Sequence, residues 1–220
     1  MKKIKAVVFD LDGTLINTLE DIALACNKVL SDNGYPEHPV QAYGKMVGDG
    51  AITLIERALP PSLRQESEIE RLYALFRKEY ADRAHRSTCL YPGIKELLEH
   101  LKKMGIPMAV LSNKPDFIVK DSVKPFLPLE YFDILLGHKD GEKPKPDPAG
   151  LKRIISAWEL EKEPSCVCMV GDSDVDVFTA KAAGASSCGA AWGFRGREEL
   201  EKAGADFVAD SACELLEFFS

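Results

Sequence analysis

The strongest constraint on the fold is an alternation of short apolar segments with stretches of helical periodicity. The first apolar segment, Ile4 to Phe9, is continuous and rich in β-branched residues, which is typical of a strand buried in a parallel sheet. Further segments of this kind alternate with helical patterns from residue 90 onward, at 107–111, 132–136, 166–170, 187–191 and 207–208. This alternation predicts an α/β fold, a Rossmann-like parallel sheet with helices on both faces.

Residues 16–89 interrupt the alternation. Helical patterns fill this stretch, the last of them a long charged amphipathic one from Glu66 to Ala84, and no strand pattern is visible from 18 to 88. We therefore expect an inserted all-helical cap domain, with residues 1–15 and 90–220 forming the α/β catalytic core. Because ligands bind at the carboxyl ends of parallel strands, an insertion directly after the first strand is expected to act as a lid.

Composition narrows the choice of partners. The formal net charge of −7 argues against nucleic acid, which generally requires a basic face, so an anionic substrate would need a few placed cations and a metal. No apolar stretch reaches the roughly 20 residues that span a bilayer, so no membrane partner is expected. Six dispersed cysteines without a CxxC pair indicate free thiols and a cytoplasmic location. The oligomeric state stays open.

Two carboxylates, Asp10 and Asp12, follow the first predicted strand on a tight turn. Their spacing of two residues lets both face one cavity. An aspartate can act as a nucleophile and form a covalent phospho-intermediate. A second acid can protonate the leaving oxygen and then deprotonate the attacking water. A calcium loop would need further ligands and a closing glutamate, which this stretch lacks.

A second acidic segment, Gly171 to Asp176, follows a later predicted strand. Its alternating acids match the opening of a calcium-binding loop, but Val177 and Ala183 stand where that loop needs glycine and glutamate. At a strand end Asp172 is expected to bind Mg²⁺ through oxygen. Asp176 is expected either to support the metal ligands from behind or to support the start of the following helix.

Four polar segments thus follow predicted strands, and the topology of a parallel sheet would bring them to one edge. They are Asp10-Leu11-Asp12-Gly13-Thr14, Ser112-Asn113-Lys114, Lys143-Pro144-Lys145-Pro146-Asp147-Pro148 and Gly171-Asp172-Ser173. In this order they resemble the four motifs of the haloacid dehalogenase-like hydrolases. The resemblance covers the whole chain, including the helical cap between the first and second motifs.

The resemblance implies the chemistry of the acidic residues. Asp10 would be the nucleophile, and Asp12 the general acid and base. Mg²⁺ would be held by Asp10, by the backbone carbonyl of Asp12 and by Asp172. Positioning and charge stabilisation dominate phosphoryl transfer, so a metal and one lysine suit an otherwise acidic chain.

The resemblance also implies two groups that contact the phosphate. Ser112 would form a hydrogen bond with the transferring phosphoryl group. Lys143, the first lysine of the Lys-Pro-x-Pro pattern, would neutralise charge on the phosphate and on the nucleophile. Spacing alone does not exclude Lys139 or Lys145. Lys114 is expected to be a solvated surface residue.

Further residues are expected to bind the substrate. Asn113 would help to orient the phosphate together with the amides of Gly13 and Thr14. In the cap, Gly48 and Gly50 lie in a segment that is similar to one in bacterial phosphoglycolate phosphatases. Glycines there would let backbone amides reach a small anionic substrate, and the alternative is an ordinary glycine loop at a helix start.

These observations predict a magnesium-dependent phosphatase for a small phosphorylated metabolite, with phosphoglycolate as the favoured substrate. The same motifs occur in β-phosphoglucomutase-like enzymes, pyrophosphatases and nucleotidases, which stay as alternatives. A different class of function, a non-catalytic binding protein on this scaffold, is disfavoured by the presence of Asp10, Asp12, Lys143 and Asp172.

Overall fold

The computed structural model describes residues 3–83, 85–139 and 141–219. The chain divides into two units, one of residues 1–17 and 90–220 and the other of residues 18–89. Ala84, the predicted end of the last helical pattern of the insertion, lies outside the described residues. Within the described part of the chain, no helix combines the length and the apolar character needed to cross a membrane.

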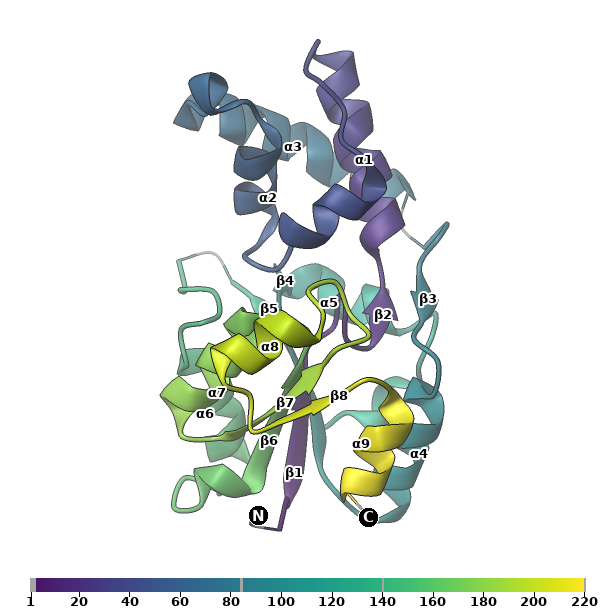
Figure 1. Cartoon of the computed structure of the whole chain (residues 1–220), viewed down its shortest axis with the longest axis vertical. Helices are drawn as coiled ribbons and strands as arrows, with labels where there is room; N and C mark the ends of the chain where they lie inside the picture. The colour runs from purple at the N-terminus through teal and green to yellow at the C-terminus, as the bar shows by residue number, and fades with distance from the viewer. Residues whose placement is uncertain (1–2, 84, 140, 220) are drawn as a thin grey trace. The chain divides into compact units, whose positions relative to one another are not determined.

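A six-stranded parallel sheet forms the centre of the first unit (Figure 1). Its strands lie in the order β5-β4-β1-β6-β7-β8. Their bounds are β1 (Ala6–Phe9), β4 (Met108–Pro115), β5 (Ile134–His138), β6 (Val167–Gly171), β7 (Ser186–Ala190) and β8 (Phe207–Ala209). Strand β1 is central and pairs with β4 on one side and β6 on the other, with Phe9 opposite Val110 and Val170. The predicted α/β class is confirmed.

Helices cover both faces of the sheet because its strands are apolar on both faces. In β1, Val7 and Phe9 belong to one buried cluster, and Ala6 and Val8 belong to another. The first cluster also takes side chains from α4 (Ile94–Lys103), α5 (Asp116–Val123) and α9 (Ala212–Phe219). The second takes them from α6 (Ala149–Ala157) and α7 (Asp174–Ala183). Short 3₁₀ helices precede β5 and β6, at Leu129–Tyr131 and Pro164–Cys166.

The structure adds elements that the periodicity did not predict. Helix α8 (Arg197–Ala203) packs against α7 through Leu200, Ala203 and Val177. Two short strands, β2 (Ile16–Asn17) and β3 (Cys89–Leu90), form a separate sheet. Strand β4 continues to Pro115, four residues beyond its expected end, which keeps Ser112 and Lys114 in extended backbone.

The second unit is helical, as expected. It consists of α1 (Leu19–Asp32), α2 (Ala51–Ala58) and α3 (Glu66–Arg83), with 3₁₀ turns at Val40–Lys45 and Pro61–Leu63. Leu30, Ile55 and Leu72, one from each α-helix, are fully buried. Each α-helix of this unit therefore buries an apolar side chain.

Candidate active site

Asp10 lies directly after β1, at the carboxyl end of the central strand of the sheet. Its backbone N–H donates to the carbonyl oxygen of Val170 at 2.8 Å, so the sheet hydrogen bonding continues into this residue. The side chain is buried, and its Oδ1 atom lies 2.8 Å from Nζ of Lys145. An ion pair at this depth keeps the carboxylate in one place and faces it with a positive charge.

The lysine beside Asp10 is Lys145, and this corrects the expectation for Lys143. Lys145 is buried and also donates to Oδ1 of Asp176 at 2.6 Å, whereas Lys143 is exposed. The pattern Lys-Pro-x-Pro occurs twice in overlap, starting at 143 and again at 145. The pattern fits either lysine, and burial in the folded structure distinguishes them.

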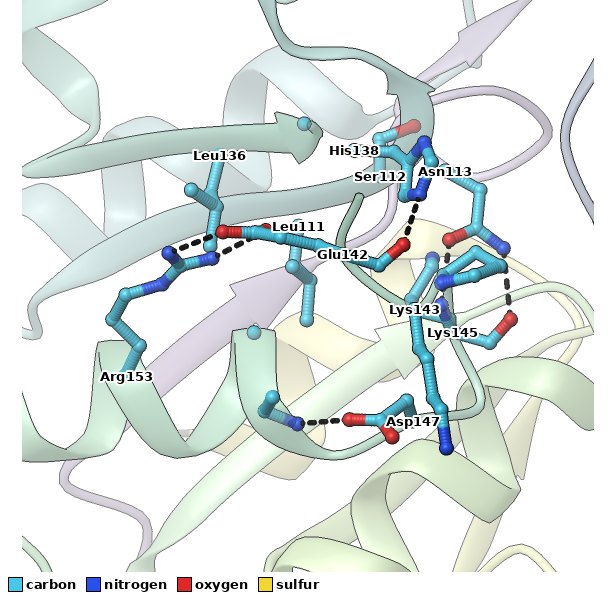
Figure 2. Close-up of a pocket in the computed structure, with 14 residues that line it drawn as sticks. Leu111, Ser112, Asn113, Leu136, His138, Glu142, Lys143, Lys145, Asp147 and Arg153 are labelled. Carbon is cyan, nitrogen blue, oxygen red and sulfur yellow. Dashed lines mark hydrogen bonds and ion pairs between the residues drawn. The ribbon is translucent and has the colours of Figure 1, made fainter. Parts of the chain in front are cut away.

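Asn113 also differs from its expected role. Its Oδ1 accepts from the backbone N–H of Lys145 at 2.7 Å, and its Nδ2 donates to the carbonyl oxygen of Lys145 at 3.1 Å. Figure 2 shows these two bonds as dashed lines between β4 and the loop that carries the lysine. Asn113 thus holds the main chain of Lys145 through two hydrogen bonds, and so fixes the position of its Cα atom.

Three buried carboxylates converge at this edge of the sheet. Oxygens of Asp10, Asp172 and Asp176 all lie within 4.8 Å of one another. Both carboxylate oxygens of Asp176 already accept hydrogen bonds. Its Oδ1 accepts from Lys145, and its Oδ2 accepts from Oγ of Ser173 at 2.9 Å, in a capping box at the start of α7. Asp172 and Asp10 are therefore the better placed pair to coordinate a cation, with Asp176 behind them.

Burial raises the pKa values of two carboxyl groups in this cluster. Burial above all, with Asp176 and Asp12 adding to it and Lys145 opposing it, raises the pKa of Asp10 to about 7. Burial, with the charges of Asp10 and Asp176, also raises the pKa of Asp172 well above its usual range. Burial opposes the charge of Lys145, but the two aspartates raise its pKa overall. A cluster of oxygen donors with unneutralised negative charge fits a hard divalent cation.

Asp12 is paired with Lys114, which was expected to be a solvated surface residue. Nζ of Lys114 donates to both Oδ1 and Oδ2 of Asp12, each at 3.0 Å, and the Lys114 side chain is only 5% exposed. The signal that would have found it is strand alternation. Because β4 runs on to Pro115, Ser112 and Lys114 lie on the same face of the strand.

The turn after Asp12 is closely packed. Gly13 has a φ of +93°, and a Cβ there would overlap the carboxylate of Asp172. The amide of Gly13 donates to the carbonyl oxygen of Ile16, and that of Thr14 to Leu11, so both amides are used within the turn rather than for phosphate as expected. Gly13 instead provides the space in which Asp172 reaches the site.

A loop after β7 fastens this turn. Nε1 of Trp192 donates to the carbonyl oxygen of Thr14 at 3.0 Å. The backbone N–H of Phe194 donates to Oδ2 of Asp172 at 2.7 Å. A Cβ at Gly193, between them, would overlap Asp172 and the carbonyl oxygen of Gly13. Residues 192–194 therefore position both Asp172, a predicted metal ligand, and the turn that contains Gly13 and Thr14. The cue in the sequence was their place after the strand at 187–191.

A pocket of about 410 Å³ adjoins the site on the side of α6 (Figure 2). Ser112, which is buried, lines it together with Asn113 and Lys145. Arg153 and Glu142 also line it and form an ion pair at 3.0 Å. Asp10 and Asp12 do not line this pocket, so it is not the space in which they would act.

Gly48 and Gly50 belong to the helical unit. Both have positive φ, +116° and +90°, and Gly50 precedes α2. Arg57 connects this loop to α2: it lies 2.6 Å from Asp49 and donates to the carbonyl oxygen of Met46 at 3.0 Å. The contact of the two glycines with substrate stays a prediction.

Comparison with known proteins agrees with this geometry. The profile of the haloacid dehalogenase-like hydrolase family matches residues 7–190. A phosphoglycolate phosphatase from Vibrio parahaemolyticus is 38% identical over 219 residues, covering 97% of this chain and 95% of the relative.

Solved structures show the same architecture. The structure of a predicted phosphoglycolate phosphatase from Haemophilus somnus superposes with a TM-score of 0.91 at 30% identity, covering all of both chains. CbbY from Rhodobacter sphaeroides, solved in complex with phosphate, superposes with a TM-score of 0.79 at 26% identity over 96% of each chain.

Proposed function

This chain belongs to the haloacid dehalogenase-like hydrolases and is a phosphoric monoester hydrolase, and on that basis we propose that it hydrolyses phosphoglycolate through a phosphorylated Asp10, with Mg²⁺ as cofactor. The observation that carries the proposal is the buried Asp10 carboxylate at the end of β1, 2.8 Å from Lys145 and within 4.8 Å of Asp172. The substrate is inferred from relatives that carry the name phosphoglycolate phosphatase.

In the proposed reaction a carboxylate oxygen of Asp10 attacks the phosphorus atom, and the bond from phosphorus to the ester oxygen breaks. Asp12 gives a proton to that leaving oxygen. Asp12 then takes a proton from a water molecule whose oxygen attacks phosphorus. The bond between phosphorus and Asp10 breaks, and inorganic phosphate leaves.

Other side chains bind and orient the phosphoryl group. Lys145 carries the positive charge closest to Asp10, so it would stabilise charge on the transferring oxygens, and Ser112 would donate a hydrogen bond to them. Mg²⁺, held by Asp10, Asp172 and the carbonyl oxygen of Asp12, would supply further positive charge to the phosphoryl group. Asp176 would orient Lys145, since the two are 2.6 Å apart.

The test is release of inorganic phosphate from phosphoglycolate, sugar phosphates, nucleoside monophosphates and pyrophosphate, each with Mg²⁺ or EDTA. We expect the highest kcat/KM for phosphoglycolate and loss of release with EDTA. Asp10→Asn should abolish release while the protein stays folded. Asp174→Asn is the matched control: its carboxylate is on the same acidic segment as Asp172 but outside the cluster, and its activity should stay near that of the parent.

Other outcomes would redirect the assignment. Preference for a sugar phosphate would retain the chemistry and discard phosphoglycolate. Isomerisation of a sugar phosphate without phosphate release would indicate a mutase. Turnover by Asp10→Asn at the parental rate would overturn the assignment of Asp10 as the nucleophile.

A further inference from the structure

Lys114 is the side chain that holds the carboxylate of Asp12. Within the described residues, both hydrogen bonds that the Asp12 carboxylate accepts come from Nζ of Lys114, each at 3.0 Å. Asp10 instead faces Lys145, 2.8 Å away. The two buried lysines therefore hold the two acids of the proposed reaction separately, and a contact to both oxygens restricts the rotation of the Asp12 carboxylate.

The position of Lys114 is set by the end of β4. Its side chain is only 5% exposed, and its backbone N–H donates to Oγ of Ser112 at 3.1 Å. In the neighbouring β5, the backbone N–H of Gly137 donates to Oδ1 of Asp116 at 2.8 Å, and a Cβ at Gly137 would overlap the carbonyl oxygen of Lys114. A fixed main chain on both sides and burial of the side chain together restrict the ammonium group to one place.

Proton transfer by Asp12 requires a restraint of this kind. A general acid or base acts only when its oxygen lies within hydrogen-bond reach of its partner atom, about 2.6–3.2 Å, and such a group contributes roughly 10²- to 10⁴-fold to a rate. Asp12 lies in the turn after β1, and its side chain is 19% exposed. Packing alone thus leaves this carboxylate room to rotate, and the two hydrogen bonds from Lys114 remove that freedom.

We propose that Lys114 is a positioning residue for Asp12, and that through Asp12 it enables hydrolysis of esters whose leaving oxygen must be protonated. This inference rests on the proposed function. An alkoxide needs a proton from Asp12 as its bond to phosphorus breaks, whereas p-nitrophenolate leaves without one. The later attack of water on the phosphorylated Asp10 needs Asp12 as a base, whichever ester was bound. Lys114 itself gains and loses no proton in either step.

The losses caused by replacing the two buried lysines should then depend differently on the leaving group. Lys145 faces Asp10 and would act on the transferring phosphoryl group, which is the same in every ester. Lys145→Met should therefore lower kcat/KM for phosphoglycolate and for p-nitrophenyl phosphate by similar factors. Lys114→Met should lower it mainly for phosphoglycolate, so that the ratio of the two values falls by about 10- to 100-fold, since a misplaced acid retains part of its contribution.

The first test measures this ratio with Mg²⁺ in the parent and in each variant. In Lys114→Arg, which keeps the charge and can reach both carboxylate oxygens, the ratio should fall less than in Lys114→Met. Lys120→Met, at an exposed position on α5, is the control and should leave the ratio unchanged. Each ratio comes from one preparation, so it does not depend on how much of a variant is folded, and Lys114→Gln replaces the methionine variant if that one folds poorly.

The second test follows the phosphorylated enzyme. In Lys114→Met, attack of water on phosphorylated Asp10 should become slower than release of p-nitrophenolate. Rapid mixing with p-nitrophenyl phosphate should therefore give a burst of p-nitrophenolate stoichiometric with the enzyme. In an Asp12→Asn background, Lys114→Met should change the ratio of kcat/KM values no further, because the lysine acts through Asp12.

Three results would contradict these expectations in different ways. An equal loss on both esters without a burst would overturn the inference, because loss of a charge near the phosphate or poorer folding affects both esters alike. A further fall of the ratio in the Asp12→Asn background would also overturn it, since the lysine would then act on the leaving group directly. Absence of Mg²⁺-dependent phosphate release from either ester by the parent would overturn the proposed function itself.

Discussion

Nζ of Lys145 lies 2.8 Å from Oδ1 of Asp10, and this pair joins a loop before α6 to the central strand of the sheet. The same ammonium group is 2.6 Å from Asp176, at the start of α7. One lysine thus connects three segments that are far apart in sequence. Its charge is therefore fixed at the point where the proposed nucleophile would meet the phosphate.

Replacing Lys145 and Lys143 in turn should show which lysine of the Lys-Pro-x-Pro pattern acts on the phosphate. We expect Lys145→Met to reduce kcat by about 100-fold or more, since a preorganised charge at the reacting group is removed. The exposed Lys143→Met is the matched control and should change kcat by less than about threefold. Steady-state kinetics on one substrate, with thermal melting to verify folding, makes the comparison. The reverse order of effects would return the role to Lys143.

The raised pKa of Asp10 predicts how stability depends on pH when no divalent cation is present. The folded protein holds this proton up to about pH 7, whereas the unfolded chain loses it near 3.8, so the folded state binds more protons between these values. Stability should therefore fall as pH rises through that window, and Asp172 adds to the same trend.

Thermal unfolding in EDTA between pH 5 and 8 measures this effect. The fall in Tm should be smaller in Asp10→Asn, which has no carboxylate at that position to ionise. Mg²⁺ should raise Tm more at pH 8 than at pH 5, because the ionised cluster binds it better. Parallel pH profiles for the parent and the variant would show that Asp10 does not titrate in this window.

The hydrogen bond from Trp192 to Thr14 should affect metal binding. Groups that orient metal ligands typically contribute 10- to 100-fold in affinity, and the Trp192 loop also orients Asp172 through Phe194. We expect Trp192→Phe to weaken Mg²⁺ binding by roughly 10-fold. Trp158→Phe is the control, because Trp158 instead donates to Asp133 at 3.3 Å, from the end of α6.

The control variant also provides an optical measurement. The chain has two tryptophans, so Trp158→Phe leaves Trp192 as the sole indole. Its fluorescence should change on titration with Mg²⁺ and reverse with EDTA. Unchanged Mg²⁺ affinity in Trp192→Phe would mean that the Trp192 side chain contributes to packing and not to metal binding.

In the helical unit, Asp21 should be a determinant of stability. Its buried carboxylate accepts from the backbone N–H groups of Ser87 and Thr88, and from the Thr88 hydroxyl at 2.6 Å. Asp21→Ala leaves these donors without an acceptor and should lower the free energy of unfolding by about 2–3 kcal/mol. Urea denaturation measures it. Asp32→Ala, at the exposed end of the same helix, should have little effect, and equal losses would refute the assignment.

Local pattern was sufficient for most of the sheet. The apolar runs around Val7, Val110 and Val170 predicted strands, and these three strands are neighbours in the structure. Helix α8 was missed because it is only seven residues long and buries just Leu200 and Ala203, too few positions to establish a period. The end of β4 was also misjudged, because the polar residues 112–114 and then Pro115 interrupt the apolar run although the backbone stays extended.

For the site, the amino-acid sequence was enough to show which carboxylates stand at the carboxyl ends of strands, since strand and helix periodicity is a local property. It was not enough to show which lysine forms an ion pair with each carboxylate. Lys143 and Lys145 fit one pattern equally well, and Lys114 follows a strand as any surface lysine would. The choice among these lysines is made by the tertiary fold, because ion pairs and burial depend on distances between segments remote in sequence, and no pattern within one segment records those distances.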